Sequence, residues 1–369
     1  MRIKNLTLNN IRNYSKLFLE FSSNINVFIG ENAQGKTNIL EAIYFAALGR
    51  SHRTTIDAEL INWQAEAARI NILFTRLEVE NNISITLQKN CREILLNSSN
   101  IKPKELIGNL NVIMFSPEDL SIIKGMPVNR RRFLDIEISQ ADPAYYKLYL
   151  KYNRVLAQRN NLLKKIRDNR AKADFLDPWD EQIGTLAEKI LKKRLAAVKK
   201  LAMLANLMQR RITGRRENLT ITYQRRENDI IGAEDNFREW YLTKLREMRN
   251  IDIRHGNTGV GPHRDDLVFK VNDVNLRTYG SQGQQRTGVL ALKLAELEFI
   301  KSETGEYPVM LLDDVMSELD GERRECLLAF IKDKIQTFIT STDEILFKTK
   351  LAASYYQVKQ GQVFFLRNL

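Results

Sequence analysis

Cysteine is scarce in this sequence, and long apolar runs are absent from it. The two cysteines among 369 residues, Cys91 and Cys326, lie in unrelated segments without histidine partners at metal-like spacing, so both are expected to be free thiols. No apolar run reaches 18 residues, and the N-terminus lacks the apolar stretch of a signal peptide. A membrane-spanning segment is therefore not predicted, and the protein is expected in the cytoplasm.

Positive charge is plentiful but unevenly distributed. Charged residues make up 28% and hydrophobic residues 43% of the chain, and its net charge is +12. Residues 121–216 contain 23 Lys and Arg against 9 Asp and Glu, a balance of +14, so the rest of the chain carries about −2. This asymmetry favours a polyanionic partner, because each neutralised phosphate releases counterions. The alternative is a solvated helical face that only aids solubility.

A phosphate-binding motif lies near the N-terminus. An apolar run typical of a buried strand ends at Gly30, a helical pattern follows Lys36, and the spacing between them matches G-x-x-x-x-G-K-[ST]. Backbone N–H groups of such a loop bind phosphate oxygens at a helix N-terminus, while Lys36 reaches the β and γ phosphates and the Thr37 hydroxyl holds Mg²⁺. The alternative is a glycine-rich turn with a solvated lysine. The predicted nucleotide-binding residues are Gly30, Glu31, Asn32, Ala33, Gln34, Gly35, Lys36, Thr37 and Asn38.

Alternating apolar residues predict β-structure around this motif. Residues 1–25 indicate a hairpin that leads into the P-loop strand, and residues 68–96 indicate an antiparallel meander. The run 112–115 predicts a further strand, which is followed by a helix with Ser116 as N-cap and Pro117 at its first position.

The basic segment has a helical pattern. Apolar residues recur on one face before and after a break at residues 174–178, which predicts two long helices that form a hairpin arm. We therefore expect a basic arm at residues 126–216, inserted between head segments 1–125 and 217–369. The candidate DNA contacts are the arm residues Arg130, Arg131, Arg132, Lys192, Lys193 and Arg194.

A second chemical motif lies far along the chain. The apolar run 309–312 ends in Asp313 and Asp314, which is the form of a Walker B strand. Asp313 is predicted to complete the Mg²⁺ site with Thr37, and Asp314 to act with Lys36 in catalysis by orienting or deprotonating water. Lys36 and Asp313 are 277 residues apart, so both ends of the chain must join one sheet.

A serine- and glycine-containing turn precedes the helical run that begins near residue 287. Such a helix N-terminus also accepts phosphate. Because one complete P-loop needs no second phosphate nest, we predict that this turn contacts the γ-phosphate held by another copy of the chain. The predicted signature residues acting in trans are Ser281, Gln282, Gly283, Gln284 and Gln285.

Taken together, these motifs resemble those of the ABC-type ATPases in the branch that includes SMC and Rad50 proteins. The matching segments are the P-loop, the 281–285 signature, Asp313-Asp314 and the D-loop run 317–320. The Q-loop position at 116–119 has no glutamine, and Thr340 lies near the switch position that usually holds histidine. The resemblance implies an α/β fold: an ABC-ATPase head, a P-loop NTPase with a mixed sheet and an antiparallel β-subdomain, and an inserted helical-hairpin arm.

Within that branch, residues 124–135 and 261–267 resemble bacterial recombination mediators. This resemblance implies ATP and Mg²⁺ as cofactors, ATP-dependent homodimerisation, and a weak, DNA-stimulated ATPase. It also implies single- and double-stranded or gapped DNA as a partner in DNA repair, replication and the SOS response, with RecR as protein partner and loading of the recombinase RecA as outcome. It implies no membrane partner and a bacterial, nucleoid-associated location.

Two further functions are weighed against this one. A P-loop kinase would use the nucleotide motif but not residues 281–286, and a transporter ATPase would not need the basic arm. Residues 261–266 match no mechanism derived from their spacing, and a metal site at His263 and Asp265 is the minor alternative.

Overall fold

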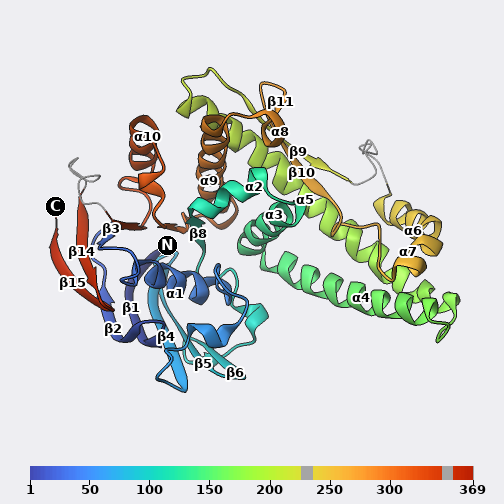
Figure 1. Cartoon of the computed structure of the whole chain (residues 1–369), viewed down its shortest axis with the longest axis horizontal. Helices are drawn as coiled ribbons and strands as arrows, with labels where there is room; N and C mark the ends of the chain where they lie inside the picture. The colour runs from blue at the N-terminus through green and yellow to red at the C-terminus, as the bar shows by residue number, and fades with distance from the viewer. Residues whose placement is uncertain (226–235, 343–351, 369) are drawn as a thin grey trace. The chain divides into compact units, whose positions relative to one another are not determined.

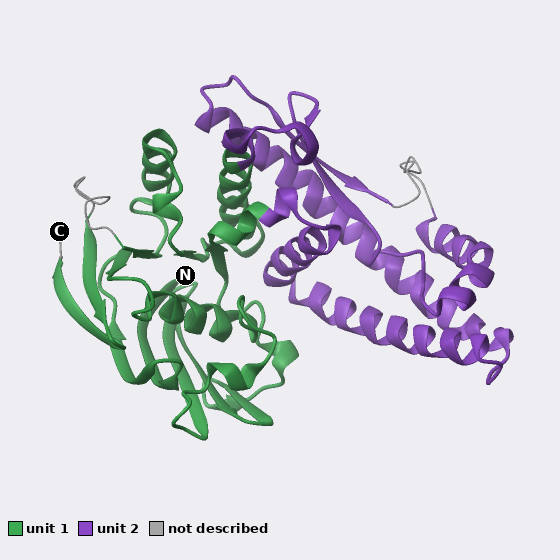
Figure 2. Ribbon diagram, in the orientation of Figure 1, with its two compact units in different colours: residues 1–120, 286–369 green, residues 121–285 purple. Residues whose placement is uncertain are grey.

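The computed structural model describes residues 1–225, 236–342 and 352–368 of the chain (Figure 1). These residues form two compact units, coloured separately in Figure 2. Unit 1 combines Met1–Leu120 with Arg286–Leu369, and unit 2 is Ser121–Gln285. The ends of the chain therefore share one unit, as the spacing of Lys36 and Asp313 requires. No helix in the described part of the chain has the length and apolar character needed to cross a bilayer.

One sheet of unit 1 is antiparallel, with strand order β2-β1-β4-β5-β6-β7. Its inward-facing positions are fully buried, for example Ile70, Ile72 and Phe74 on β4, because successive side chains of a strand point to opposite faces. The predicted N-terminal hairpin and the meander are therefore confirmed. The strands are β1 (Arg2–Ile11), β2 (Tyr14–Glu20), β4 (Ala67–Arg76), β5 (Val79–Gln88), β6 (Cys91–Leu96) and β7 (Ser99–Asn100).

The other sheet of unit 1 is mixed, with strand order β15-β14-β3-β13-β12-β8. Strands β8, β12, β13, β3 and β14 run parallel, and β15 pairs antiparallel with β14. Strands β8 and β12 are apolar along their whole length because both faces of a parallel sheet are covered. The strands are β3 (Ile25–Ile29), β8 (Val112–Phe115), β12 (Val309–Leu312), β13 (Thr337–Ser341), β14 (Ala353–Lys359) and β15 (Gln362–Asn368).

Helices connect the strands of unit 1. Ser116 and Asp119 form a capping box with Pro117 in the first turn, which confirms the predicted N-cap after β8. Cys91 and Cys326 are free thiols, also as predicted. The α-helices are α1 (Lys36–Leu48), α9 (Gln282–Thr304), which begins in unit 2, and α10 (Gly321–Ile331). The 3-10 helices are η1 (Asp57–Leu60), η2 (Pro103–Glu105), η3 (Pro117–Asp119) and η5 (Val315–Ser317).

Unit 2 is built around the two long helices predicted for the arm, α4 (Pro143–Arg167) and α5 (Asp177–Ile212). Asp142 caps α4 by accepting hydrogen bonds from two backbone N–H groups, Ala144 and Tyr145. The other elements are α2 (Leu120–Lys124), α3 (Pro127–Ala141), η4 (Ala173–Leu176), β9 (Leu219–Gln224), α6 (Phe237–Glu247), α7 (Arg249–His255), β10 (Asp266–Val271), β11 (Val274–Asn275) and α8 (Leu276–Tyr279).

The predicted domain boundaries need correction. Residues 217–285, expected in the C-terminal head segment, belong to the same compact unit as the arm helices. The sheet β11-β10-β9 completes unit 2, and β9 follows α5 directly, with Leu219 N donating to Asn206 Oδ1 on that helix at 3.0 Å. The arm is therefore part of an α+β unit, because the hydrophobic faces of its helices are covered by later elements that local pattern did not assign to them.

Candidate functional site

Two glycines shape the loop between β3 and α1. Gly35 has a φ of 116°, and a Cβ there would lie 2.5 Å from Asn13 Nδ2 and 2.9 Å from the Tyr14 hydroxyl. A Cβ on Gly30 would collide with the Val358 carbonyl oxygen. Each position therefore requires glycine, but for its own reason. Position 35 needs a left-handed backbone angle, and position 30 is approached too closely by β14.

The loop is held from two neighbouring turns. Asn13 Nδ2, in the β1–β2 turn, donates to the Gln34 carbonyl at 2.9 Å. From the β14–β15 turn, Gln360 N donates to Gln34 Oε1 at 2.6 Å and Gly361 N donates to the Gln34 carbonyl at 3.3 Å. Contacts within the protein therefore fix the shape of the loop, which lowers the cost of ordering it around a ligand.

Lys36 lies at the base of the loop and is 4% exposed. Its Nζ donates to the carbonyl oxygens of Gly30 at 2.7 Å and Glu31 at 2.8 Å. Burial lowers the pKa of Lys36, and the negative charges of Asp314 and Asp313 oppose that shift. A buried ammonium held by weakly competing carbonyls is suited to exchange them for phosphate oxygens.

The Walker B strand meets the P-loop directly. β12 lies between β8 and β13, and at its end Asp313 Oδ1 accepts a hydrogen bond from Thr37 Oγ1 at 2.9 Å. Thr340, at the end of β13, donates to the same oxygen at 2.8 Å. The structure therefore brings together Lys36, Thr37 and Asp313 in unit 1, as the sequence predicted, and adds Thr340 as a supporting contact.

Asp314 adopts an unusual backbone conformation. Its φ is 51°, in the left-handed region, and its N–H donates to Thr340 Oγ1 at 2.9 Å. Burial raises the pKa of this carboxyl, the nearby Asp313 adds to the rise, and Lys36 opposes it. The turn thus points the backbone away from the strand path directly after Asp313, so the two carboxylates have different surroundings.

The signature turn is at the surface of unit 2, except that Gln285 is buried and its Nε2 donates to the Leu276 carbonyl at 2.8 Å, which corrects its prediction as a contact in trans. Ser281 and Gln282 are exposed, and α9 begins at Gln282. Gln284 N donates to Ser281 Oγ at 3.2 Å while Ser281 N donates to Gln284 Oε1 at 3.1 Å, which is a capping box. The exposed serine is therefore held in a defined position at a helix N-terminus, and its contact with a partner copy stays a prediction.

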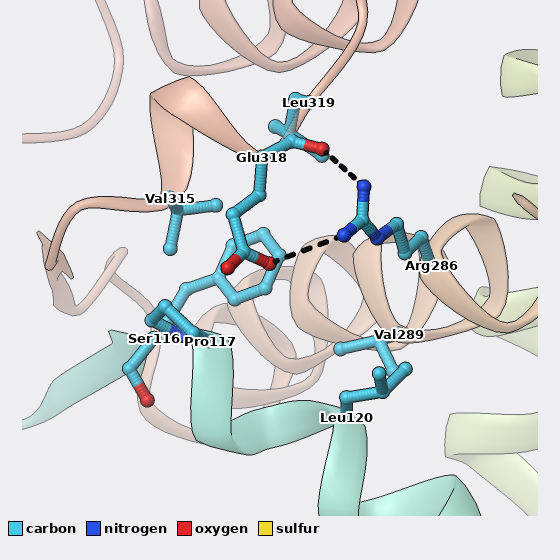
Figure 3. Close-up of a pocket in the computed structure, with 9 residues that line it drawn as sticks. Ser116, Pro117, Leu120, Arg286, Val289, Val315, Glu318 and Leu319 are labelled. Atoms are coloured by element: carbon cyan, nitrogen blue, oxygen red, sulfur yellow. Dashed lines mark hydrogen bonds and ion pairs between the residues drawn. The ribbon is translucent and has the colours of Figure 1, made fainter. Parts of the chain in front are cut away.

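Arginines hold the D-loop of unit 1. Arg286 NH1 donates to the Glu318 carbonyl at 3.0 Å, and the close-up in Figure 3 shows its guanidinium reaching both that carbonyl and the Glu318 carboxylate. Arg324 donates to the carbonyls of Met316 at 3.2 Å and Leu319 at 2.9 Å. A cavity of about 30 Å³ beside Arg286 has apolar walls that include Leu319. The D-loop is therefore fixed to helices α9 and α10.

A groove beside the P-loop was not found from the sequence. Its volume is about 400 Å³, and its lining includes Arg12, Asn13, Asn38 and the fully exposed Trp63. Arg12 is held by Glu41 of α1 through two hydrogen bonds of 2.8 and 2.9 Å. These residues come from three separate segments. Asn38 was predicted from the P-loop, but no motif in residues 57–64 could have indicated Trp63.

Two of the candidate DNA contacts are placed differently from the prediction. Arg130 and Arg194 are each 2% exposed, Arg130 in a two-point ion pair with Asp266 and Arg194 in one with Asp135. They are corrected from DNA contacts to core residues, because a buried guanidinium that already pairs with a carboxylate has no face left for a phosphate.

The other four candidates are more accessible. Arg131 is partly buried and donates to the Asp265 carbonyl at 2.8 Å, and Arg132 is exposed. Lys192 and Lys193 have exposed fractions of 59% and 39%. These four stay predictions for DNA contact.

Residues 261–266 lie in the buried polar region of unit 2 that also contains Arg130 and Arg194. His263 contacts the Tyr152 hydroxyl at 2.6 Å and the Thr258 carbonyl at 3.0 Å through its two ring nitrogens. Asp265 accepts a hydrogen bond from the Tyr223 hydroxyl at 2.6 Å. Among the described residues no group of three or more His, Cys, Asp or Glu side chains is arranged to hold a metal. The segment therefore uses its polar side chains to join α4, β9 and β10.

The sequence matches a known protein family over almost its whole length. Residues 2–363 match the family described as RecF/RecN/SMC N terminal domain. The chain is 45% identical over 366 residues to the DNA replication and repair protein RecF of Clostridium tetani, covering 98% of this chain and 99% of the relative. It is 44% identical over 347 residues to the protein of the same name from Halothermothrix orenii, covering 93% and 92%.

A solved structure is also similar over the whole chain. The structure of the recombination mediator protein RecF-ATP in the RecFOR pathway superposes with a TM-score of 0.92 at 36% identity, covering 99% of this chain and 98% of that one. The fold class expected from the sequence, an α/β ABC-type ATPase head with an inserted helical unit, is confirmed by this match.

Proposed function

This chain belongs to the RecF family of DNA replication and repair proteins, and on that premise we propose that it is a DNA-binding ATPase whose two copies close around ATP. ATP-dependent dimerisation sets how long the protein stays on DNA, and slow hydrolysis reopens the dimer. The observation that carries the proposal is the division of the site: Lys36, Thr37 and Asp313 meet in unit 1, whereas the capped Ser281 is exposed at a helix N-terminus in unit 2.

The residues at the end of β12 fit a magnesium ion. Mg²⁺ takes oxygen ligands in a tight octahedron and keeps several waters. The Thr37 hydroxyl and the Asp313 carboxylate are oxygen ligands of this kind, and their oxygens lie 2.9 Å apart. Thr37 and Asp313 would therefore hold the ion, which when bound neutralises charge on the phosphate oxygens.

The groove near Trp63 suits the base of ATP. It borders Asn38, the residue directly after the Mg²⁺-ligand candidate Thr37, so a nucleotide with its phosphates in the P-loop can extend into it. Trp63 offers an exposed aromatic face for stacking, and Arg12 and Arg53 supply donors. We assign this groove to the adenine and ribose.

Asp314 acts as the general base. Burial raises its pKa, which makes the carboxylate a stronger proton acceptor than an exposed aspartate, and the positive charge of Lys36 opposes part of that rise in pKa. Many ABC ATPases carry glutamate here, and the shorter aspartate places the carboxylate farther from the attacking water. The expected result is weak hydrolysis, which DNA stimulates and which serves as a timer.

In cells this cycle would act in gap repair and the SOS response. The dimer would bind single- and double-stranded DNA through accessible cations of unit 2, with Arg131, Arg132, Lys192 and Lys193 as the remaining candidates. RecR is the proposed protein partner, and loading of the recombinase RecA is the proposed outcome.

A mixing experiment tests the shared site. Lys36→Met removes the phosphate contact of one half-site, and Ser281→Arg blocks the other half-site while leaving ATP binding by the monomer intact. A heterodimer of the two variants contains one intact composite site. Mixing equal amounts should therefore restore ATP hydrolysis to at most about a quarter of the wild-type rate, although each variant alone is inactive.

The control is the double variant, Lys36→Met with Ser281→Arg in one chain, mixed with itself. It should stay inactive, and light scattering should show dimers with ATP but not with ADP for the wild-type protein only. If mixing restored no activity and wild-type monomers hydrolysed ATP, the trans assignment would be contradicted.

A further inference from the structure

One carboxylate connects the last turns of α5 to the first turn of α9. Glu217 Oε1 accepts a hydrogen bond from Gln284 Nε2 at 3.0 Å, and Glu217 Oε2 accepts one from Gln209 Nε2 at 2.7 Å. Gln209 is fully buried and lies on α5, whereas Gln284 lies on α9. All three residues belong to unit 2, so the connection lies within one compact body.

The carboxylate also determines which way the Gln284 amide faces. Gln284 Oε1 accepts from Ser281 N at 3.1 Å, while its Nε2 donates to Glu217. A carboxylate only accepts hydrogen bonds, so it selects the amide orientation in which the oxygen faces Ser281. Without Glu217 the amide can rotate and present its NH₂ group to the Ser281 N–H, which breaks the capping box.

The loop that carries Glu217 is itself fixed to α5. Thr213 Oγ1 donates to the Gln209 carbonyl at 2.8 Å and accepts from Glu217 N at 3.3 Å. A shift of α5 along its axis or a rotation about it therefore moves Glu217. Since α5 is 36 residues long, roughly 54 Å at 1.5 Å per residue, its first residue, the exposed Asp177, lies well away from Ser281.

From these contacts we infer that Glu217 is a positioning residue that couples the arm helix α5 to Ser281 through Gln284, so that the state of the arm sets the alignment of the signature turn for the partner copy. The inference rests on the proposed trans contact of Ser281. It assigns to Glu217 neither a ligand nor a step of the hydrolysis, only control of the geometry on which dimerisation depends.

The variant Glu217→Gln tests this coupling. A glutamine has one acceptor and one NH₂ group, so it can satisfy only one of the two amide donors that face position 217. We expect ATP-dependent dimerisation to weaken roughly tenfold or more, because each such hydrogen bond involves a charged acceptor. The ATP affinity of the monomer should not change. The dimer is measured by sedimentation and the affinity with a fluorescent ATP analogue.

The matched control is Glu188→Gln. Glu188 lies on the same helix and pairs with Lys192 at 2.7 Å, in a surface ion pair outside this connection. Its substitution should leave dimerisation unchanged, since exposed pairs contribute little. Equal weakening by both variants would overturn the inference, as that would reflect loss of charge alone.

An exchange of the two side chains gives a rescue. In the double variant Glu217→Gln with Gln284→Glu, the new glutamine accepts from Gln209 and donates to position 284, and the new glutamate still accepts from Ser281 N. Dimerisation should recover from the level of either single variant. A double variant no better than the worse single variant would overturn the inference.

Failure of this inference differs from failure of the proposed function. If wild-type protein does not dimerise with ATP and the mixed Lys36→Met and Ser281→Arg variants stay inactive, the shared site is wrong. If both of those experiments succeed and Glu217→Gln dimerises like the wild-type protein, the shared site stands and only the coupling role of Glu217 is overturned.

Discussion

Lys36 in unit 1 is buried against two backbone carbonyls, whereas Arg130, Arg159 and Arg194 in unit 2 are buried against carboxylates. The Lys36 ammonium can exchange carbonyl contacts for phosphate contacts at modest cost. By contrast, removal of the arginine that pairs with a buried carboxylate leaves the negative charge of that carboxylate uncompensated. This comparison predicts that the buried Lys36 of unit 1 binds a ligand, whereas the buried arginines of unit 2 stabilise the fold. Four predictions test this difference between the buried cations of the two units.

The largest effect is expected for Arg194→Met in unit 2. The substitution leaves Asp135 buried without its ion-pair partner, so the free energy of unfolding should fall by roughly 3–5 kcal/mol. Urea unfolding monitored by circular dichroism measures the change, and the protein with Asp135→Asn added should regain part of the loss. Unchanged stability with weaker DNA binding would mean that Arg194 contacts DNA after all.

The matching change in unit 1, Lys36→Met, should alter binding and not folding. Loss of the buried ammonium should weaken ATP binding by about 100-fold or more, because the phosphates lose a charge-assisted contact at the loop. The melting temperature without nucleotide should stay near that of the wild-type protein. A large fall in that temperature would show that Lys36, like Arg194, is chiefly structural.

The pH dependence of stability separates the contributions of two buried groups of unit 2, Asp265 and His263. Burial raises the pKa of Asp265 to about 6, so this group contributes stability at low pH that is lost as pH rises through 6. Burial lowers the pKa of His263 to about 4, so its contribution is present above pH 6.5 and is lost as pH falls. The two contributions oppose each other in the wild-type protein.

Asp265→Asn should therefore expose the effect of His263. Between pH 7 and pH 5 the variant should lose about 1 kcal/mol more of its unfolding free energy than the wild-type protein loses. Urea titrations at both pH values give the two slopes, independently of any constant difference in stability. Parallel slopes for variant and wild type would contradict the burial-driven shift of Asp265.

The smallest effect concerns the exposed cations of unit 2. Arg132→Glu should weaken DNA binding a few-fold and lower the slope of log K against log salt by about one, the value for one lost phosphate contact. The control is Lys89→Glu, an exposed lysine of unit 1. An equal change in both slopes, measured by fluorescence anisotropy, would mean that Arg132 acts through the overall charge and not through a phosphate contact.

The same comparison shows how far the sequence could go. The P-loop, the capping box at Ser116 and the Walker B strand were predictable because each depends on neighbours within a few residues, where spacing alone fixes backbone geometry. The two arm helices were found from the period of their apolar residues, but the roles of Arg130 on α3 and Arg194 on α5 were misread. A run of arginines has the same local pattern whether water or a buried aspartate lies opposite.

From local motifs alone came three chemical predictions for this protein: a phosphate-binding loop, a pair of oxygen ligands for magnesium and a serine at a helix start. Only the tertiary structure decided which residues meet, by bringing Thr37 to Asp313 across 276 positions, by placing residues 217–285 with the arm, and by tying Glu217 to Gln284. The reason is physical: backbone motifs are local, whereas burial and ion pairing depend on segments that only folding makes neighbours.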